Sequence, residues 1–309
     1  MPPVQIQDPT EAACYVAERF WNPYLAAAEK DSSLYSIDEQ KFISFYRQYI
    51  EVLNMLEKNL ANLSPDKQAR ARKITANSHK SIIEAADSLY TKGHRTLLTR
   101  LISLSEKFLY NPNSPLLNEE LYIPALEAIL NLKSIDTLHK MQHVYQLKMA
   151  LLNRTGTKAN DFSYEYINTG ASADTATPAL QKERTTLYKT PAKYLLIYFN
   201  DPDCASCKEM QQILIQDPEV NRLLNCGDLR VLSLYLSDNT TIWEERFKNV
   251  PSNWIYARDY KKEMESNELY GIRAIPSMYL LDKDKKVLLK DAPAERIIAF
   301  FNQMTGAAL

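Results

Sequence analysis

The sequence is short of three things: cysteine, charge of one sign, and long apolar runs. Four cysteines occur in 309 residues, which is too few for a disulfide framework. Basic and acidic residues nearly balance, with a formal net charge of −1. Binding to nucleic acid or a membrane surface requires a basic face, so no nucleic-acid partner is expected. No window approaches the run of about 18 apolar residues that a membrane-spanning helix needs.

The N-terminal stretch, MPPVQIQDPT, also lacks the basic and apolar regions of a signal peptide. Two alternatives remain open from the residues alone. The protein is cytosolic, or an export signal has been removed from this chain, so Met1 is not established as the native start.

The first half of the chain has a helical pattern. Apolar side chains recur at three- and four-residue steps, the spacing of one helix face. Two such stripes are Leu97, Leu101, Leu104 and Phe108, and Leu138, Met141, Tyr145, Met149 and Leu152. Ser64 and Pro65 predict a helix start, with serine as the N-cap and proline in the first turn. Residues 1–152 are therefore predicted to form an all-α domain.

The second half alternates between strand-like and helix-like segments. Short apolar runs predict buried strands at 194–199, 229–236 and 254–256. A hairpin is predicted from 277–281 and 286–289, followed by a last helix over 293–304. This order predicts an α/β domain at 153–309 with a central mixed sheet and helices on both faces.

The stretch FNDPDCASCKEM, residues 199–210, holds a C-x-x-C pair between an apolar run and a helical run. A cysteine at a helix N-terminus meets unpaired N–H groups and the positive end of the helix dipole, which favour the reactive thiolate. A second cysteine one turn later can attack a mixed disulfide and release the product. Cys204 is therefore the candidate attacking thiol and Cys207 the candidate resolving thiol.

A zinc site also uses C-x-x-C, but it needs a second pair of ligands. Cys226 stands alone, and all four histidines lie in the helical half. We therefore predict no metal and no cofactor other than a redox-active Cys204–Cys207 disulfide. Cys14 and Cys226 are predicted to be ordinary buried thiols.

Residues 270–277, YGIRAIPS, resemble the thioredoxin segment that carries a cis-proline opposite the C-x-x-C pair. The dithiol after a buried strand and the final hairpin plus helix occur in the matching order. The resemblance implies that Ile275 offers its backbone to an incoming substrate chain. It also implies that Pro276 shapes the groove and keeps the dithiol clear of metals.

Gly156, Ala159 and Phe162 are similar to the opening of TlpA/ResA-like thioredoxin domains. That resemblance implies an added N-terminal hairpin and an insert before the cis-proline, which residues 243–259 fit. The helical half, with FWNPY near its start, resembles a domain of unknown function that precedes TlpA-like domains in envelope lipoproteins of Gram-negative bacteria. The resemblance implies a periplasmic or cell-envelope location, with a lipid anchor lost from this chain.

The sequence departs from the thioredoxin pattern around the dithiol. Asp203 stands where thioredoxins usually have tryptophan, and Tyr198 stands at the position of their buried carboxylate. The TlpA-type carboxylate position holds Met210, with Glu209 one residue away. Asp203 and Glu209 are therefore candidate modulators of the pair. A carboxylate beside Cys204 disfavours the thiolate, which predicts a reductant or isomerase-like role over a strong oxidase.

Two functions from different classes follow. The first is a thiol–disulfide oxidoreductase of the bacterial cell envelope, acting on a disulfide-containing protein substrate and supplied by an unnamed electron donor. The second is a non-catalytic binding or structural envelope protein that uses the thioredoxin fold as a platform. The intact C-x-x-C and Ile-Pro pairs favour the first, and the missing carboxylate favours the second.

Overall fold

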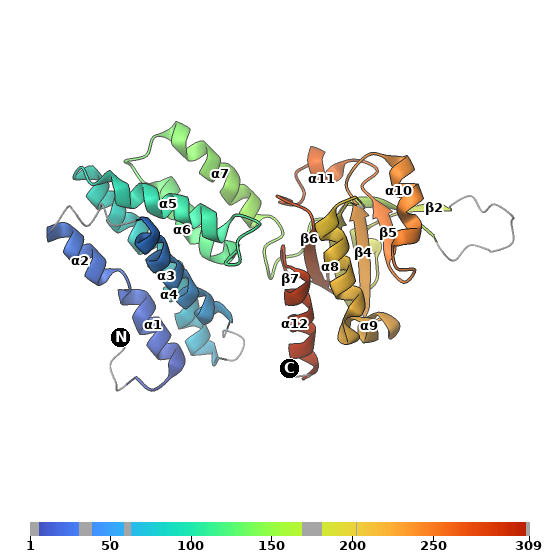
Figure 1. Ribbon diagram of the computed structural model, residues 1–309, viewed down its shortest axis with the longest axis horizontal. Helices are drawn as coiled ribbons and strands as arrows, with labels where there is room; N and C mark the ends of the chain where they lie inside the picture. The colour runs from blue at the N-terminus through green and yellow to red at the C-terminus, as the bar shows by residue number, and fades with distance from the viewer. Residues whose placement is uncertain (1–5, 31–38, 59–62, 169–180, 202, 307–309) are drawn as a thin grey trace. The chain divides into compact units, whose positions relative to one another are not determined.

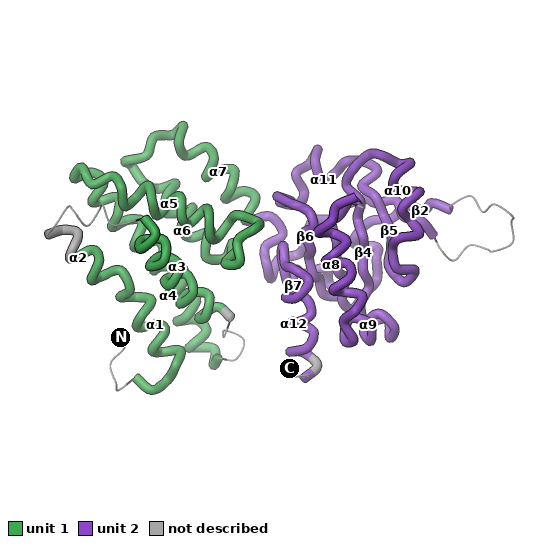
Figure 2. Tube along the Cα trace, viewed as in Figure 1, with its two compact units in different colours: residues 1–150 green, residues 151–309 purple. Residues whose placement is uncertain are grey.

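A computed structural model describes residues 6–30, 39–58, 63–168, 181–201 and 203–306 of the chain (Figure 1). The chain divides into two compact units, residues 1–150 and residues 151–309 (Figure 2). The first unit is helical, and the second is built on a β-sheet. The predicted fold class, a helical half followed by a mixed α/β half, is confirmed.

Helices account for the regular structure described in the first unit. They are α1 Pro9–Arg19, α2 Asn22–Lys30, α3 Glu39–Lys58, α4 Pro65–Thr91, α5 Arg95–Leu109, α6 Glu119–Asn131 and α7 Thr137–Leu151. Helix α4 begins at Pro65 as predicted, but the Ser64 side chain makes no capping hydrogen bond within the described residues. Within those residues, no helix combines the length and apolar character needed to cross a bilayer.

The apolar stripe predicted on α7 is only partly buried. Met149 is buried, but Leu138, Met141 and Tyr145 are 74%, 63% and 53% exposed. The buried side of α7 is partly polar, because Gln146 accepts a hydrogen bond from Tyr122 and donates one to Glu106, at 2.9 and 2.8 Å. Satisfied polar groups thus share the inward side of this helix with Met149 and Ala150.

A polar cluster lies inside the aromatic core of the helical unit. His79 on α4 is fully buried, and its Nε2 lies 3.1 Å from the Tyr46 hydroxyl and 3.2 Å from the Ser105 hydroxyl. Its Nδ1 has no hydrogen-bond partner among the described residues. Burial lowers the pKa of His79 to about 4, so the imidazole is neutral at physiological pH.

This lowered pKa predicts acid sensitivity of the helical unit. The unfolded chain takes up a proton at His79 near its ordinary pKa, and the folded chain does not, so stability falls as the pH drops below that value. Between pH 7 and pH 5 the free energy of unfolding should fall by about 2 kcal/mol through this residue alone. Urea titrations of wild type and His79→Gln at both pH values measure it.

The variant should lose most of this pH dependence, whatever its stability at neutral pH. An equal pH dependence in His79→Gln and wild type would contradict the assignment.

The second unit is built on one sheet. In the described residues its strands are β1 Ser163–Ile167, β2 Lys182–Thr186, β3 Tyr194–Asn200, β4 Leu229–Tyr235, β5 Ile255–Arg258, β6 Ser277–Asp282 and β7 Val287–Leu289. Their order is β2-β1-β5-β4-β3-β6-β7. Strand β3 pairs parallel to β4 and antiparallel to β6, so the sheet is mixed. The strands predicted from apolar runs are confirmed, and β5 belongs to the predicted insert.

Helices complete this unit. They are α8 Ala205–Gln216, α9 Pro218–Asn225, α10 Thr240–Arg246, α11 Glu263–Ser266 and α12 Ala294–Thr305. Alternate residues of β3 point to opposite faces of the sheet. Leu196 and Tyr198 pack with α8, α9 and α12, while Leu195, Ile197 and Phe199 pack with residues of α11 and the loop after it. Both faces are therefore covered, as β3 requires with its nearly unbroken apolar sequence.

Candidate redox site

The C-x-x-C pair lies where β3 ends and α8 begins. Strand β3 runs to Asn200, and Cys204 is the N-cap of α8. Asn200 is buried, and its side-chain amide donates hydrogen bonds to the Tyr198 carbonyl and the Ser233 hydroxyl, at 2.8 and 2.9 Å. These bonds fix the end of the strand from which the pair is presented.

Cys204 and Cys207 form a disulfide, with their Cα atoms 5.2 Å apart. The Cys207 backbone N–H donates to the Cys204 sulfur at 3.1 Å, and the Ser206 hydroxyl lies 3.2 Å from that sulfur. Cys207 is 3% exposed, and Cys204 is only partly buried. An N–H donor at a helix start stabilises negative charge on sulfur, so the geometry suits Cys204 as the thiolate and Cys207 as the shielded partner.

Tyr198 lies beneath the pair. Its hydroxyl donates to the Cys207 carbonyl at 2.5 Å, and its ring meets Trp254 edge-on, with centroids 6.0 Å apart. Burial raises the pKa of Tyr198, so the phenol is neutral and acts here as a donor. The buried carboxylates described in this unit are engaged elsewhere: Glu165 binds Arg258, and Asp259 accepts backbone bonds from Glu263 and Met264.

The segment before β6 reaches the same edge of the sheet. The Ile275–Pro276 bond is cis, and the next residue, Ser277, pairs with Phe199 near the end of β3. This register places Pro276 beside the strand end that leads into the dithiol. Ile275 is 36% exposed, so this residue lies at the surface.

The Asp291 carboxylate binds side chains on both sides of the cis-proline bond. Asp291 accepts hydrogen bonds from the Arg273 guanidinium at 2.7 Å and from the Ser277 hydroxyl at 2.8 Å. Both side chains of the Arg273–Asp291 ion pair are 13% exposed. Local sequence patterns do not identify Arg273 or Asp291 as residues that hold this segment, because each acts through a partner that is distant in the sequence.

The two candidate modulators differ in their surroundings. Asp203 forms an ion pair with Arg246 of α10, at 2.8 Å, with 52% and 43% of the two side chains exposed. Glu209 lies on α8 with its side chain exposed. The sequence contains no local signal that would place Arg246 beside Asp203.

The remaining cysteines are free, and one prediction about them is wrong. Cys14 is buried, and burial raises the pKa of its thiol. Cys226 is exposed rather than buried, because it forms the C-cap at the end of the short α9, where the chain turns at Gly227.

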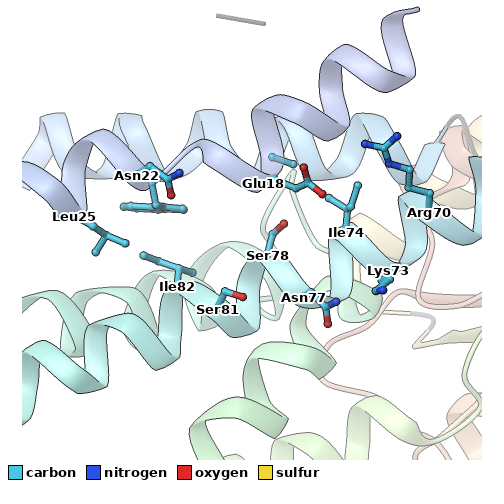
Figure 3. A pocket seen from close by; sticks show the side chains of 12 residues that line it. Glu18, Asn22, Leu25, Arg70, Lys73, Ile74, Asn77, Ser78, Ser81 and Ile82 are labelled. Atoms are coloured by element: carbon cyan, nitrogen blue, oxygen red, sulfur yellow. The ribbon is translucent and has the colours of Figure 1, made fainter.

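A groove in the helical unit, between α1–α2 and α4, has a volume of about 360 Å³. Figure 3 shows Leu25 facing Ile82 at one end and Arg70 at the other. Two of its charged groups have partners, since Arg70 pairs with Glu11 and Glu18 pairs with Arg19.

Comparisons with known proteins agree with this division. Residues 2–153 match a domain of unknown function, DUF5106, and residues 181–305 match the thioredoxin-like domain family. A thioredoxin-like protein from Bacteroides caccae is 28% identical, with a TM-score of 0.77, over 97% of this chain and 96% of that one. No curated protein matches the chain.

Two further solved structures match about half of this chain. The C-terminal domain of an uncharacterized protein from Bacteroides fragilis is 34% identical, over 48% of this chain and 97% of that one, with a TM-score of 0.42. A domain of a possible thiol-disulfide isomerase from Cytophaga hutchinsonii is 24% identical, over 50% and 94%, with a TM-score of 0.38.

Proposed function

Because the chain belongs to the proteins that join a DUF5106 domain to a thioredoxin-like domain, we propose that it is a thiol–disulfide oxidoreductase. The observation that carries the proposal is the position of Cys204. It caps α8, its sulfur accepts the Cys207 N–H, and the cis Ile275–Pro276 bond lies at the same sheet edge. Cys204 and Cys207 are the proposed catalytic residues, and Ile275 and Pro276 the proposed substrate-binding residues.

In the reducing direction the Cys204 thiolate attacks one sulfur of a substrate disulfide. A Cys204–substrate disulfide forms, and the other substrate sulfur leaves as a thiolate and takes up a proton. Cys207 then loses its proton and attacks the Cys204 sulfur, which releases the second substrate thiol. Two electrons pass to the substrate, and an external dithiol donor must reduce the resulting Cys204–Cys207 disulfide.

The charge beside Cys204 supports a reductant or isomerase-like role. The Asp203 carboxylate opposes the thiolate, and a less stable thiolate makes the disulfide less oxidising. In the described residues, neither buried carboxylate of this unit is bonded to Cys207, so bulk water or the substrate is the proposed acceptor of its proton.

Redox equilibrium tests the proposal. The protein is equilibrated with glutathione or dithiothreitol couples, free thiols are alkylated, and modification at Cys204 and Cys207 is counted by mass spectrometry. We expect a two-electron transition between roughly −200 and −300 mV. A potential near −120 mV, typical of strong periplasmic oxidases, would contradict the reductant role.

The alternative is a non-catalytic binding or structural protein that uses the same fold as a platform. Tyr198, at the place of the thioredoxin carboxylate, favours it because a buried phenol bonded to the Cys207 carbonyl is a poor base. The same titration decides: a pair that never forms a disulfide, or that stays oxidised below the stated range, would support this alternative.

A cell-envelope location, a membrane or periplasmic electron donor and a lipid anchor are further parts of the proposal. They rest on the resemblance of the helical half to domains of envelope lipoproteins. Fractionation of cells that express the complete gene tests the location, and a cytoplasmic protein would contradict it.

A further inference from the structure

The loop before α8 holds Asp203 at the start of that helix. The Asp201 carboxylate accepts the Asp203 N–H at 2.8 Å, and the Asp201 carbonyl accepts the Cys204 N–H at 3.1 Å. Asp203 directly precedes Cys204, so its charge lies one residue away from the proposed attacking thiol. Its own carboxylate accepts a hydrogen bond from Arg246 at 2.8 Å.

Arg246 lies on α10, a helix that packs firmly against the sheet. Trp243 of α10 is fully buried and stacks on Tyr256 of β5, with ring centroids 5.7 Å apart. The Asn239 side chain caps α10 by accepting the Ile242 N–H at 3.1 Å. Phe247, directly after Arg246, packs against the same aromatic cluster. Both sides of Arg246 along the chain are thus held against the sheet.

We propose that Arg246 is a positioning residue that sets the reactivity of Cys204 through Asp203. The proposal deepens the proposed function, since it concerns the same dithiol. Arg246 offsets part of the negative charge with which the Asp203 carboxylate opposes the thiolate. The insert between β4 and β6 thereby controls the electrostatics of the C-x-x-C pair from outside the motif.

The charged groups of the loop, of α8 and of α10 determine whether a substitution stabilises or destabilises the Cys204 thiolate. Acidic groups come from Asp201 and Asp203 in the loop and Glu209 on α8, and basic groups from Lys208 on α8 and Arg246 on α10. Without Arg246 the acidic groups dominate, and the thiolate is less stable. Without the Asp203 charge the balance reverses, and the thiolate is more stable.

The test measures the reaction of the reduced protein with iodoacetamide as a function of pH, read by mass spectrometry at Cys204. At a pH below the midpoint of the profile, Arg246→Gln should react about threefold more slowly than wild type, the size expected for partly exposed charges. Asp203→Asn should react faster than wild type. Arg246→Lys keeps the charge and should recover most of the rate.

A double variant separates action through Asp203 from direct action on the sulfur. In the Asp203→Asn background, Arg246→Gln should change the rate by less than about 1.5-fold, because coupled residues are not additive. High salt should weaken the effect of Arg246→Gln. Lys248, an exposed cation two residues further along, is the matched control, and Lys248→Gln should leave the profile unchanged.

Two outcomes would overturn the proposal. One is an unchanged pH profile in Arg246→Gln, which would make the ion pair merely structural. The other is an equal effect of Arg246→Gln with and without the Asp203 charge. Neither depends on turnover, because alkylation reports the thiol itself, so a protein without oxidoreductase activity could still show the predicted shift.

Discussion

Cys204→Ser is expected to bring disulfide reduction to the uncatalysed background, a loss of at least about a thousandfold. A serine hydroxyl stays protonated at neutral pH and cannot form the mixed disulfide. The measurement is turnover of a disulfide-containing protein such as insulin, with dithiothreitol as the donor. Substantial activity in Cys204→Ser would contradict the assignment of the attacking thiol.

Cys207→Ser should fail at a different step. Cys204 keeps its N–H donor from residue 207, so attack still occurs, but no thiol remains to release the product. A covalent protein–substrate disulfide should accumulate and be visible by mass before reduction. Cys226→Ser is the matched control, since Cys226 is a free exposed thiol, and that variant should retain full turnover.

The strands and the dithiol could be predicted because their signals are local. A run such as YLLIYFN in β3 is apolar on both faces, and that pattern is typical of a central strand. The position of Cys204 at the start of α8 followed from the change of pattern within 199–210. The paired hairpin and final helix were likewise visible from turn residues and spacing.

The orientation of α7 could not be predicted in the same way. Its stripe is apolar, but a pattern shows only that apolar residues share a side, not that another element covers that side. The hydrogen bonds that bury Gln146 come from Tyr122 and Glu106, which lie on α6 and α5. Such partners become visible only once the helices are packed.

Arg246 was hidden for a related reason. It is separated from Asp203 by 43 positions, and its charge alone does not distinguish it from any surface arginine. The order of the strands brings Arg246 and Asp203 together. Strand β3 leads into Asp203, β5 anchors α10, and β4 lies between these two strands. The proposed effect of Arg246 on Cys204 therefore depends on the tertiary structure and has no local signal in the sequence.

The buried ion pairs of Glu165 also depend on the tertiary structure, because they join residues of three separate strands. Glu165 on β1 is 5% exposed at its side chain and binds Arg258 of β5 at 2.6 Å and Arg184 of β2 at 2.9 Å. Arg258 also donates to the Thr240 hydroxyl at the start of α10, at 2.6 Å. Burial would raise the pKa of Glu165, but the two guanidinium groups outweigh burial and lower it. One carboxylate thus joins the added hairpin, the insert strand and α10.

Glu165→Ala should destabilise the α/β unit by about 3 kcal/mol, because it leaves the mostly buried Arg258 charge without its partner. Arg184→Ala removes the other partner, whose side chain is 62% exposed, and should cost less than about 1 kcal/mol. Urea unfolding measures both, and equal losses in the two variants would contradict the role given to burial.

Hydrogen exchange should locate the damage from Glu165→Ala in β5 and α10. Because α10 carries Arg246, loosening it should also slow alkylation of Cys204, in the same direction as Arg246→Gln. Replacing the pair together, as Glu165→Leu with Arg258→Met, should restore most of the stability, since apolar side chains of similar volume often substitute well for a buried ion pair. If the double variant regains stability but its Cys204 is still alkylated slowly, the ion pairs of Glu165 orient α10 specifically. If the stability and the alkylation rate both return, apolar packing alone is enough to hold α10 in place.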